Sequence, residues 1–207
     1  MKKIFAGIIA FIMCIAIFDA SAQNRFGAVV SANHNTLHFN QELIEVNPAI
    51  GYSAGLISDL ALGGNGFGIN ASLLYTQRSS VLHLGDKKVW ASEGYGTHRS
   101  YLHYLEIPIH VRYMYVHMNG LEEKFAPFVF AGPSFSFLVG HNDIKALKYP
   151  ALAFSMQFGL GFQLFNNYQV SAMYDLGLSK AIETKHLSEF NARNRCWQLT
   201  FTYFFKN

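Results

Sequence analysis

The feature that most constrains the fold is a two-residue alternation of apolar and polar side chains, clearest in residues 154–165. Every second position there is apolar: Phe154, Met156, Phe158, Leu160, Phe162 and Leu164. The positions between them are polar or small: Ser155, Gln157, Gly159, Gly161 and Gln163. Because successive side chains of a β-strand point to opposite faces, this period predicts a strand with one apolar and one polar face.

Seven further segments are predicted strands: residues 25–33, 50–60, 67–78, 101–117, 126–139, 169–179 and a last segment from Trp197. The alternation is weaker in 50–60 and 169–179. Residues 126–139 are mixed, because Phe128 and Phe130 share a parity with Ser134 and Ser136. The sequence therefore predicts eight strands.

The connections between these strands alternate in length. Four are long: 35–47, 82–100, 140–150 and 180–194. Three are shorter: 61–65, 118–125 and a two-residue turn at Asn166-Asn167. Short turns at one end and long loops at the other are typical of outer-membrane barrels, in which the short turns are periplasmic. Both termini are then expected in the periplasm.

The size of the side chains predicts which face is inside. The polar rows are mostly Gly, Ser, Asn, Gln and Thr, which fit the narrow lumen of eight strands. The apolar rows are bulky, and lipid is the environment in which they can face outward, whereas a soluble barrel places its apolar row inside. The predicted fold is all-β: an eight-stranded antiparallel transmembrane β-barrel of the OmpA-like up-and-down type. Its aromatic girdles are expected to include Tyr75, Tyr113, Tyr115, Trp197, Tyr203 and Phe205.

Composition removes other classes. Only 14% of the 207 residues are charged and 15% are aromatic, which excludes a disordered chain and a coiled coil. A net charge of +3 without a basic cluster argues against nucleic acid as a partner. Residues 23–207 contain no apolar run near 18 residues, so no transmembrane helix is expected there.

The first 22 residues have the pattern of a signal peptide. Lys2 and Lys3 precede an apolar run from Ile4 to Phe18, and Ala20-Ser21-Ala22 forms a small-x-small cleavage site. The expected organisation is a signal peptide at 1–22 and an outer-membrane barrel domain at 23–207. Cleavage would remove Cys14 and leave Cys196 without a partner for an intrachain disulfide.

Several charged residues are expected inside the barrel. They are Arg78, Glu106, His110, Arg112, Asp175 and Arg195. Because buried charges are costly unless they are paired, we expect a salt-bridge network that fills the lumen. A gated polar path for ions or protons is the alternative. Pro108 and Pro133 lack an amide donor, and we expect β-bulges at both.

No pattern indicates catalysis, a metal site or a cofactor. The nine His residues are scattered, no H-E-x-x-H or C-x-x-C occurs, and the glycines at 63–66 belong to a turn. Loops on a rigid scaffold commonly carry binding residues, so the 82–100 loop is a candidate interaction site. Its candidates are Trp90, Tyr95 and Arg99, which are residue types enriched in interface hot spots.

Five short motifs resemble one family. Tyr104-Leu105-Glu106-Ile107-Pro108 and Pro127-Phe128-Val129-Phe130-Ala131-Gly132-Pro133-Ser134 look like successive strands of the PorT-like outer-membrane β-barrel family. Gly159-Leu160-Gly161-Phe162, Tyr174-Asp175-Leu176-Gly177-Leu178 and the segment from Asn194 to Leu199 resemble its later strands. The resemblance implies an eight-stranded outer-membrane barrel. It also suggests a link to type IX secretion, because the founding member is needed for that export system.

We therefore expect a non-enzymatic binding or scaffold protein in the outer membrane of a Gram-negative bacterium, acting as an accessory of type IX secretion. Its expected partners are outer-membrane lipids, the barrel-insertion machinery during assembly, and secretion-system or other envelope proteins. Two alternatives stay open: an envelope structural protein or adhesin without a role in secretion, and a lipid-modifying barrel enzyme.

Overall fold

The computed structural model describes residues 24–39, 45–62, 65–83, 97–116, 124–142, 147–179, 182–184 and 191–205. Eight long strands form the wall: β1 (Asn24–Phe39), β2 (Glu45–Ala61), β3 (Phe67–His83), β4 (Thr97–Met114), β5 (Phe125–His141), β7 (Leu152–Leu164), β8 (Tyr168–Gly177) and β10 (Asn191–Phe204). Two short strands, β6 (Leu147–Lys148) and β9 (Ile182–Thr184), pair with each other, and β9 also pairs with β10.

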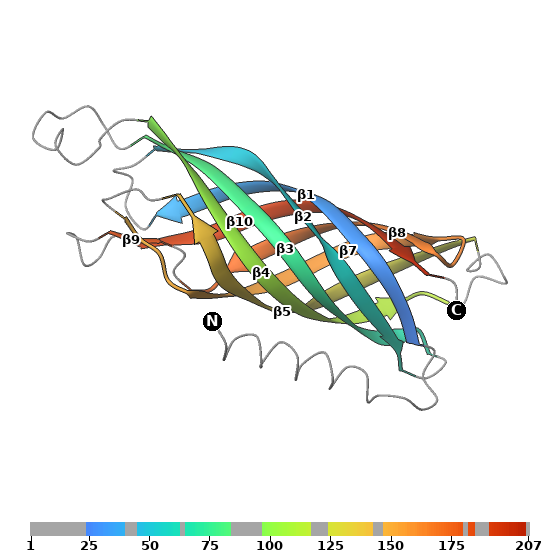
Figure 1. Ribbon diagram of the computed structural model, residues 1–207. Coiled ribbons are helices and arrows are strands. Elements are labelled where there is room, and N and C mark those ends of the chain that lie inside the picture. The colour runs from blue at the N-terminus through green and yellow to red at the C-terminus, as the bar shows by residue number, and fades with distance from the viewer. Residues whose placement is uncertain are drawn as a thin grey trace, which may run out of the picture.

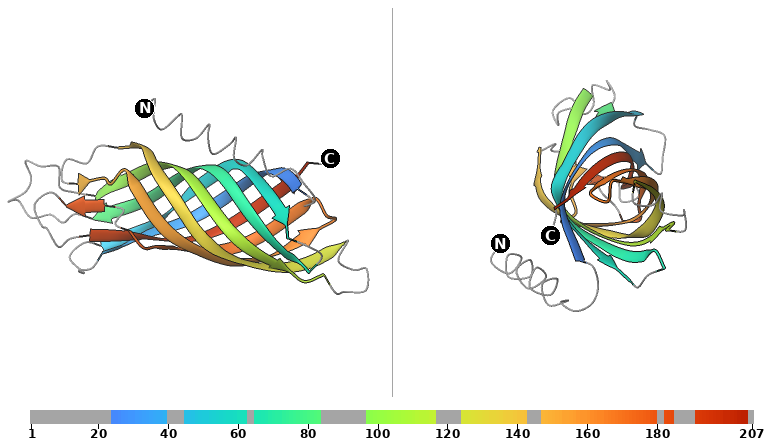
Figure 2. Two further views of the ribbon diagram at one scale, coloured as in Figure 1. Left: turned by 90° about the horizontal axis from the view of Figure 1, so that it is seen from below. Right: turned by 90° about the vertical axis from the view of Figure 1, so that its right-hand side faces the viewer.

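The long strands close into an antiparallel barrel (Figures 1 and 2). Each strand pairs with the next long strand in the chain, and β10 closes the ring by pairing with β1, from Gly27↔Phe204 to Phe39↔Ala192. The predicted eight-stranded up-and-down barrel is confirmed. Closure gives every wall strand a partner on both sides, which satisfies the backbone without a sheet edge.

The strand registers fix the tilt of the barrel. Paired residues followed once around the wall, from Asn24 through Leu60, Ile69, Val111, Ala131, Phe158, Tyr174 and Trp197, return to β1 at His34. This residue is ten positions beyond the start. A stagger of this size in eight strands corresponds to a tilt of about 40° and a lumen only wide enough for side chains.

Most strands are longer than the sequence predicts, and the four connections expected to be long are shorter. The predicted long connection 35–47 is wrong, because β1 continues to Phe39 and β2 begins at Glu45. Arg99, expected in a loop, lies in β4. The turn between β7 and β8 has three residues, 165–167, and not two, since Leu164 pairs with Tyr168. Phe165 and Asn166 adopt positive φ there, at 49° and 62°.

The two faces of the wall follow the predicted parity. In β7 the large apolar side chains from Phe154 to Leu164 face outward, and Ser155, Gln157 and Gln163 are buried in the lumen. The exposed aromatic residues form two levels on the outer wall. Phe67 and Tyr75, eight residues apart on β3, lie about 20 Å apart along the axis at ~3.3 Å per residue and ~40° tilt. This spacing fits an apolar band between two aromatic girdles.

The lumen also holds bulky residues, contrary to the expectation that these all face lipid. Tyr104, Phe128, Phe130 and Phe204 are buried inside. The rings of Phe128 and Phe130 lie over Gly161 and Gly159, their partners on β7. A Cβ at Gly159 would lie 2.6 Å from Cζ of Phe130, so the lumen has room for the ring because the glycine has no side chain.

The expected bulges at Pro108 and Pro133 are wrong. The β4–β5 pairing includes Pro108↔Ser134 and resumes at Val111↔Ala131 in the same register, and β5 and β7 pair without a shift through Pro133↔Met156. The register shifts occur elsewhere, between Pro48 and Tyr52 in β2 and between His103 and Tyr104 opposite the end of β5. The residues on either side of each proline keep their register. The wall therefore accommodates two prolines without a backbone N–H, and neither strand needs the extra residue of a bulge.

Among the residues described, none belongs to a helix long and apolar enough to cross a membrane.

Candidate functional site

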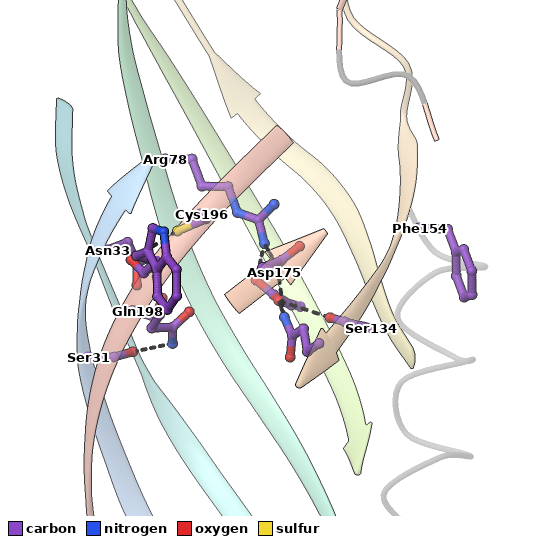
Figure 3. Close-up of polar contacts among 12 residues, drawn as sticks. Ser31, Asn33, Arg78, Ser134, Phe154, Asp175, Cys196 and Gln198 are labelled. Carbon is purple, nitrogen blue, oxygen red and sulfur yellow. Dashed lines mark hydrogen bonds and ion pairs between the residues drawn. The ribbon is translucent and has the colours of Figure 1, made fainter. Parts of the chain in front are cut away.

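The most organised polar group in the lumen is centred on Arg78 (Figure 3). The guanidinium of Arg78 on β3 donates to Glu106 Oε2 on β4 at 3.1 Å and to Asp175 Oδ2 on β8 at 2.7 Å. All three side chains are buried, with Arg78 3% exposed and Asp175 0%. In a ring of eight strands β3 and β8 are four strands apart, so the Arg78–Asp175 ion pair crosses the full width of the lumen.

Gln157 on β7 holds the two carboxylates together. Its amide nitrogen donates to Glu106 Oε1 at 2.7 Å and to Asp175 Oδ2 at 2.8 Å. Its amide oxygen lies 2.8 Å from Nε2 of His110, and the hydroxyl of Ser134 donates to Glu106 Oε1 at 2.9 Å. Side chains from five strands therefore meet in one network, which we call the Arg78 network: Arg78, Glu106, His110, Ser134, Gln157 and Asp175.

A second ionic cluster lies nearer the short-turn end. Asp59 on β2 accepts from Arg25 on β1, and Arg112 on β4 lies 3.1 Å from its other oxygen. Arg25 also donates to Gln163 Oε1 at 2.9 Å and to the carbonyl of Asn166 at 2.8 Å. Arg112 is six residues from Glu106 on β4, about 15 Å along the axis. The lumen is thus bridged by charged side chains at two levels.

Apolar side chains fill the lumen beside these clusters. Met114, Phe128, Phe130 and Met173 belong to one buried group, and the ring of Phe130 lies 4.9 Å from that of His110. Val29, Ile57, Leu74 and Phe204 form another, and Arg25 stacks over the ring of Phe204 at 4.5 Å. Packing of this kind fixes the charged side chains in one arrangement and leaves them little freedom to move.

The structure brings together four of the six charged residues expected in the lumen. Arg78, Glu106 and Asp175 bond directly, and His110 joins them through Gln157. Arg112 belongs to the second cluster. The expectation for Arg195 needs correction: it is exposed on the outer wall, because it shares the parity of Trp197, whereas Asn194 and Cys196 face inward.

The loop candidates are placed only in part. Trp90 and Tyr95 lie outside the described residues. Arg99 is exposed, and its guanidinium lies 5.3 Å from the ring centroid of Tyr101. Among the described residues there is no group of three or more His, Cys, Asp or Glu side chains placed to hold a metal ion.

Sequence reasoning missed Arg25, Asp59 and Gln157 as members of the ionic clusters. Gln157 stood in the polar row of the most regular strand, but nothing in β7 alone indicates a partner on β4 or β8. Asp59 lies in a segment whose alternation is weak. The available signal was that Asp59 is an acidic residue near the end of a strand, where a buried carboxylate would need a basic partner.

A family model agrees with this architecture. The family model described as "Outer membrane protein beta-barrel domain" matches residues 21–183. No curated protein matches the chain in sequence. Among solved structures, Ail, the attachment invasion locus protein of Yersinia pestis, is similar at 13% identity over 88% of this chain and 99% of that chain, with a TM-score of 0.43.

Two other solved structures are similar to about the same degree. The outer membrane protein OprG from Pseudomonas aeruginosa shares 10% identity over 89% of this chain and 95% of its own, with a TM-score of 0.49. The outer membrane enzyme PagL shares 14% identity over 84% of this chain and 98% of its own, with a TM-score of 0.46.

Proposed function

Since this chain belongs to the outer membrane protein beta-barrel domain family, we propose that it is a non-enzymatic binding or scaffold protein that acts through its loops and outer wall. Its lumen serves as a rigid filling and does not carry solutes. The first 22 residues act as a cleaved signal peptide, and the short-turn end, with both ends of the barrel domain, faces the periplasm.

The observation that carries this proposal is the ion pair across the lumen. Arg78 and Asp175 stand on opposite strands and bond directly, while Gln157 and Glu106 close the space beside them. Removing Arg78 would leave both carboxylates buried without their cation, at a cost of several kcal/mol. Such a network resists opening, which supports a static lumen over a gated ion path.

Conductance in planar bilayers tests the filled lumen. We expect the purified barrel to show no stable channel, because the lumen is bridged at two levels. A double variant, Arg78→Ala with Gln157→Ala, removes two side chains of the Arg78 network, which spans the lumen farther from the short turns. Arg99→Ala, which removes an exposed arginine, is the control. Large, stable pores in the unmodified protein would overturn the closed lumen.

We propose further that the partner of this scaffold is the type IX secretion machinery, as the PorT-like motifs suggest. The secreted proteome of a deletion strain, compared with its parent in a host that has this system, tests the link. Accumulation of cargo in the periplasm would support an accessory role. Unchanged secretion would refute it and leave an envelope structural protein or adhesin.

A lipid-modifying activity is tested separately. Lipid A mass spectra from the deletion strain and its parent should be identical for a non-enzymatic barrel. A mass difference in the deletion strain that disappears when the protein is supplied from a plasmid would contradict the proposal and establish an enzyme.

A further inference from the structure

The outer wall across β8, β10, β1 and β2 carries two adjoining apolar hollows. One, of about 480 Å³, lies against Val30, Val170 and Phe201. The other, of about 350 Å³, lies against Ile50, Ala172 and Trp197. Ala32 and Leu199 line both. They form because small side chains on β1 and β8 lie beside large ones on β10, as at the Ala32↔Leu199 and Leu199↔Ala172 pairs.

Basic residues lie directly beyond the second hollow. His34 on β1 lines it and pairs with Trp197 on β10. Arg195 and Arg193 lie two and four residues before Trp197 on the same outward face of β10, toward the long-loop end, and both are exposed. Each step of two residues along a strand covers about 7 Å. Among the described residues neither guanidinium has a carboxylate partner, and both side chains face outward.

The level of Trp197 places this basic group relative to the membrane. Trp197 is 61% exposed, packs 4.9 Å from the ring of Tyr174, and belongs to the aromatic level farther from the short turns. Exposed Trp and Tyr mark the boundary between lipid tails and headgroups. Arg195 and Arg193 therefore lie at headgroup height, and the hollows lie at the height of the acyl chains.

We infer that this surface, which we call the β10–β1 face, is a binding site for one lipid with an anionic phosphate headgroup. An acyl chain occupies the hollows beside Ala32 and Leu199, and the phosphate accepts hydrogen bonds from Arg195, Arg193 and His34. Guanidinium groups bind phosphate with charge-assisted, often bidentate hydrogen bonds. A zwitterionic lipid offers the same phosphate, but its ammonium group would be repelled by the two nearby guanidiniums, so the face favours a lipid with a net negative charge.

A second copy of the chain fits this face less well. Two barrels related by an axis along the membrane normal would bring the same residues together at the same height. Arg193 and Arg195 of one copy would then face those of the other, and like charges at a low-dielectric interface are unfavourable. The charge on the face thus favours lipid. The inference does not depend on the proposed scaffold role.

Quenching of Trp197 fluorescence tests the site directly. The chain has two tryptophans, so Trp90→Phe leaves Trp197 as the reporter. The full barrel is placed in vesicles with rising fractions of phosphatidylglycerol or phosphatidylcholine carrying brominated acyl chains. We expect phosphatidylglycerol to occupy the site about fivefold to tenfold more strongly, because phosphatidylcholine brings a quaternary ammonium close to the two arginines.

Two pairs of variants locate the preference. Arg193→Gln with Arg195→Gln should abolish it, whereas Arg99→Gln, also on the outer face, should keep it. Ala32→Leu should fill the hollow and weaken quenching by both lipids, and Ala131→Leu on β5 should not. Gel mobility before and after heating confirms that each variant is folded.

Three results would overturn the inference. One is equal quenching by the two lipids. Another is a preference that survives the double arginine variant. The third is shielding of Trp197 from both lipids together with dimers in cross-linking, which would identify a second copy as the occupant.

Discussion

Arg78 puts one positive charge between two buried carboxylates. It bonds to Glu106 and Asp175, and Gln157 donates to both of them as well. Each buried charge in this network therefore depends on its partners, because burial of a single charge is unfavourable unless ion pairs and hydrogen bonds offset its desolvation. The cation–π contact of Arg78 with Tyr104, at 5.6 Å, adds to this dependence.

Replacing Arg78 should thus be costly. We expect Arg78→Met to lower the free energy of unfolding by about 3–5 kcal/mol, since it leaves two carboxylates facing each other in the lumen. Glu106→Gln should cost less, about 1–2 kcal/mol, because an amide keeps part of the hydrogen bonding. Urea titration of the barrel in lipid vesicles measures both.

Arg99→Met is the matched control for Arg78→Met. Its guanidinium is exposed and contacts only the ring of Tyr101 among the contacts described, so a loss of about 1 kcal/mol or less is expected. Equal losses at the two arginines would show that the network in the lumen does not stabilise the fold.

Single residues also show how far sequence reasoning reaches. The parity of Glu106, His110 and Arg112 could be predicted, because alternation within a strand is local and has a fixed period of two. The expectation that Arg195 lies in the lumen was wrong, although the same rule counted from Trp197 places it outward. The partners could not be predicted: the Arg78–Asp175 bond depends on the registers of all the strands between β3 and β8.

Among the elements, β5 and β7 form the most closely fitted pair. Their ladder runs from Phe125↔Leu164 to Phe137↔Leu152 without a register shift, and two phenylalanines on β5 cover two glycines on β7. A glycine in a strand usually weakens it, but an aromatic ring on the neighbouring strand covers the exposed backbone. This packing explains the mixed polarity of residues 126–139, because Phe128 and Phe130 face the lumen together with Ser134 and Ser136.

Adding one methyl group tests this fit. We expect Gly159→Ala to lower the free energy of unfolding by about 1–3 kcal/mol, as overpacking does. The new Cβ would lie 2.5 Å from the carbonyl oxygen of Ala172 and 2.6 Å from Cζ of Phe130, so strands must shift. The same vesicle-based unfolding titration measures the change.

Gly140→Ala on β5 serves as the control. The nearest atoms to a Cβ there belong to His103, at 3.7 Å, which is ordinary contact, so stability should stay within about 1 kcal/mol. If Gly159→Ala is as well tolerated as Gly140→Ala, the close packing of Phe130 over β7 is wrong.

Strand ends and bulges were predicted less well than faces. β1 continues six residues past its predicted end, and β2 and β4 begin four or five residues before their predicted starts, because pairing with a neighbour continues a strand even where the polarity pattern is absent. The bulge expected at Pro108 is absent because Ser134 and the residues around it keep their register. Both outcomes depend on the partner strand, which a single segment cannot reveal.

For the whole molecule, closure between β1 and β10 is the decisive contact. These strands are the first and last of the wall, yet thirteen residue pairs join them, from Gly27↔Phe204 to Phe39↔Ala192. The barrel is therefore complete only when the last strand has been made.

A disulfide across this seam tests closure. Val30 and Phe201 are paired residues on the outer face, and facing residues of adjacent antiparallel strands have Cα atoms about 4.5–5.5 Å apart, within disulfide range. In a background with Cys14→Ser and Cys196→Ser, we expect Val30→Cys and Phe201→Cys to cross-link on mild oxidation. The bond should raise the free energy of unfolding by about 2–4 kcal/mol, because it closes a long loop of the unfolded chain.

Val30→Cys combined with Val129→Cys provides the comparison. Val129 is also exposed on the outer face, but it stands on β5, four strands from β1 around the ring. In a closed barrel these two thiols remain free and react with maleimide, whereas the seam pair is protected. Cross-linking of both pairs would mean that the strands exchange neighbours. Cross-linking of neither pair would mean that β1 and β10 stay apart. A bond in the seam pair alone requires the register that closes the wall, and that register also sets the positions of Arg78 and Asp175 across the lumen.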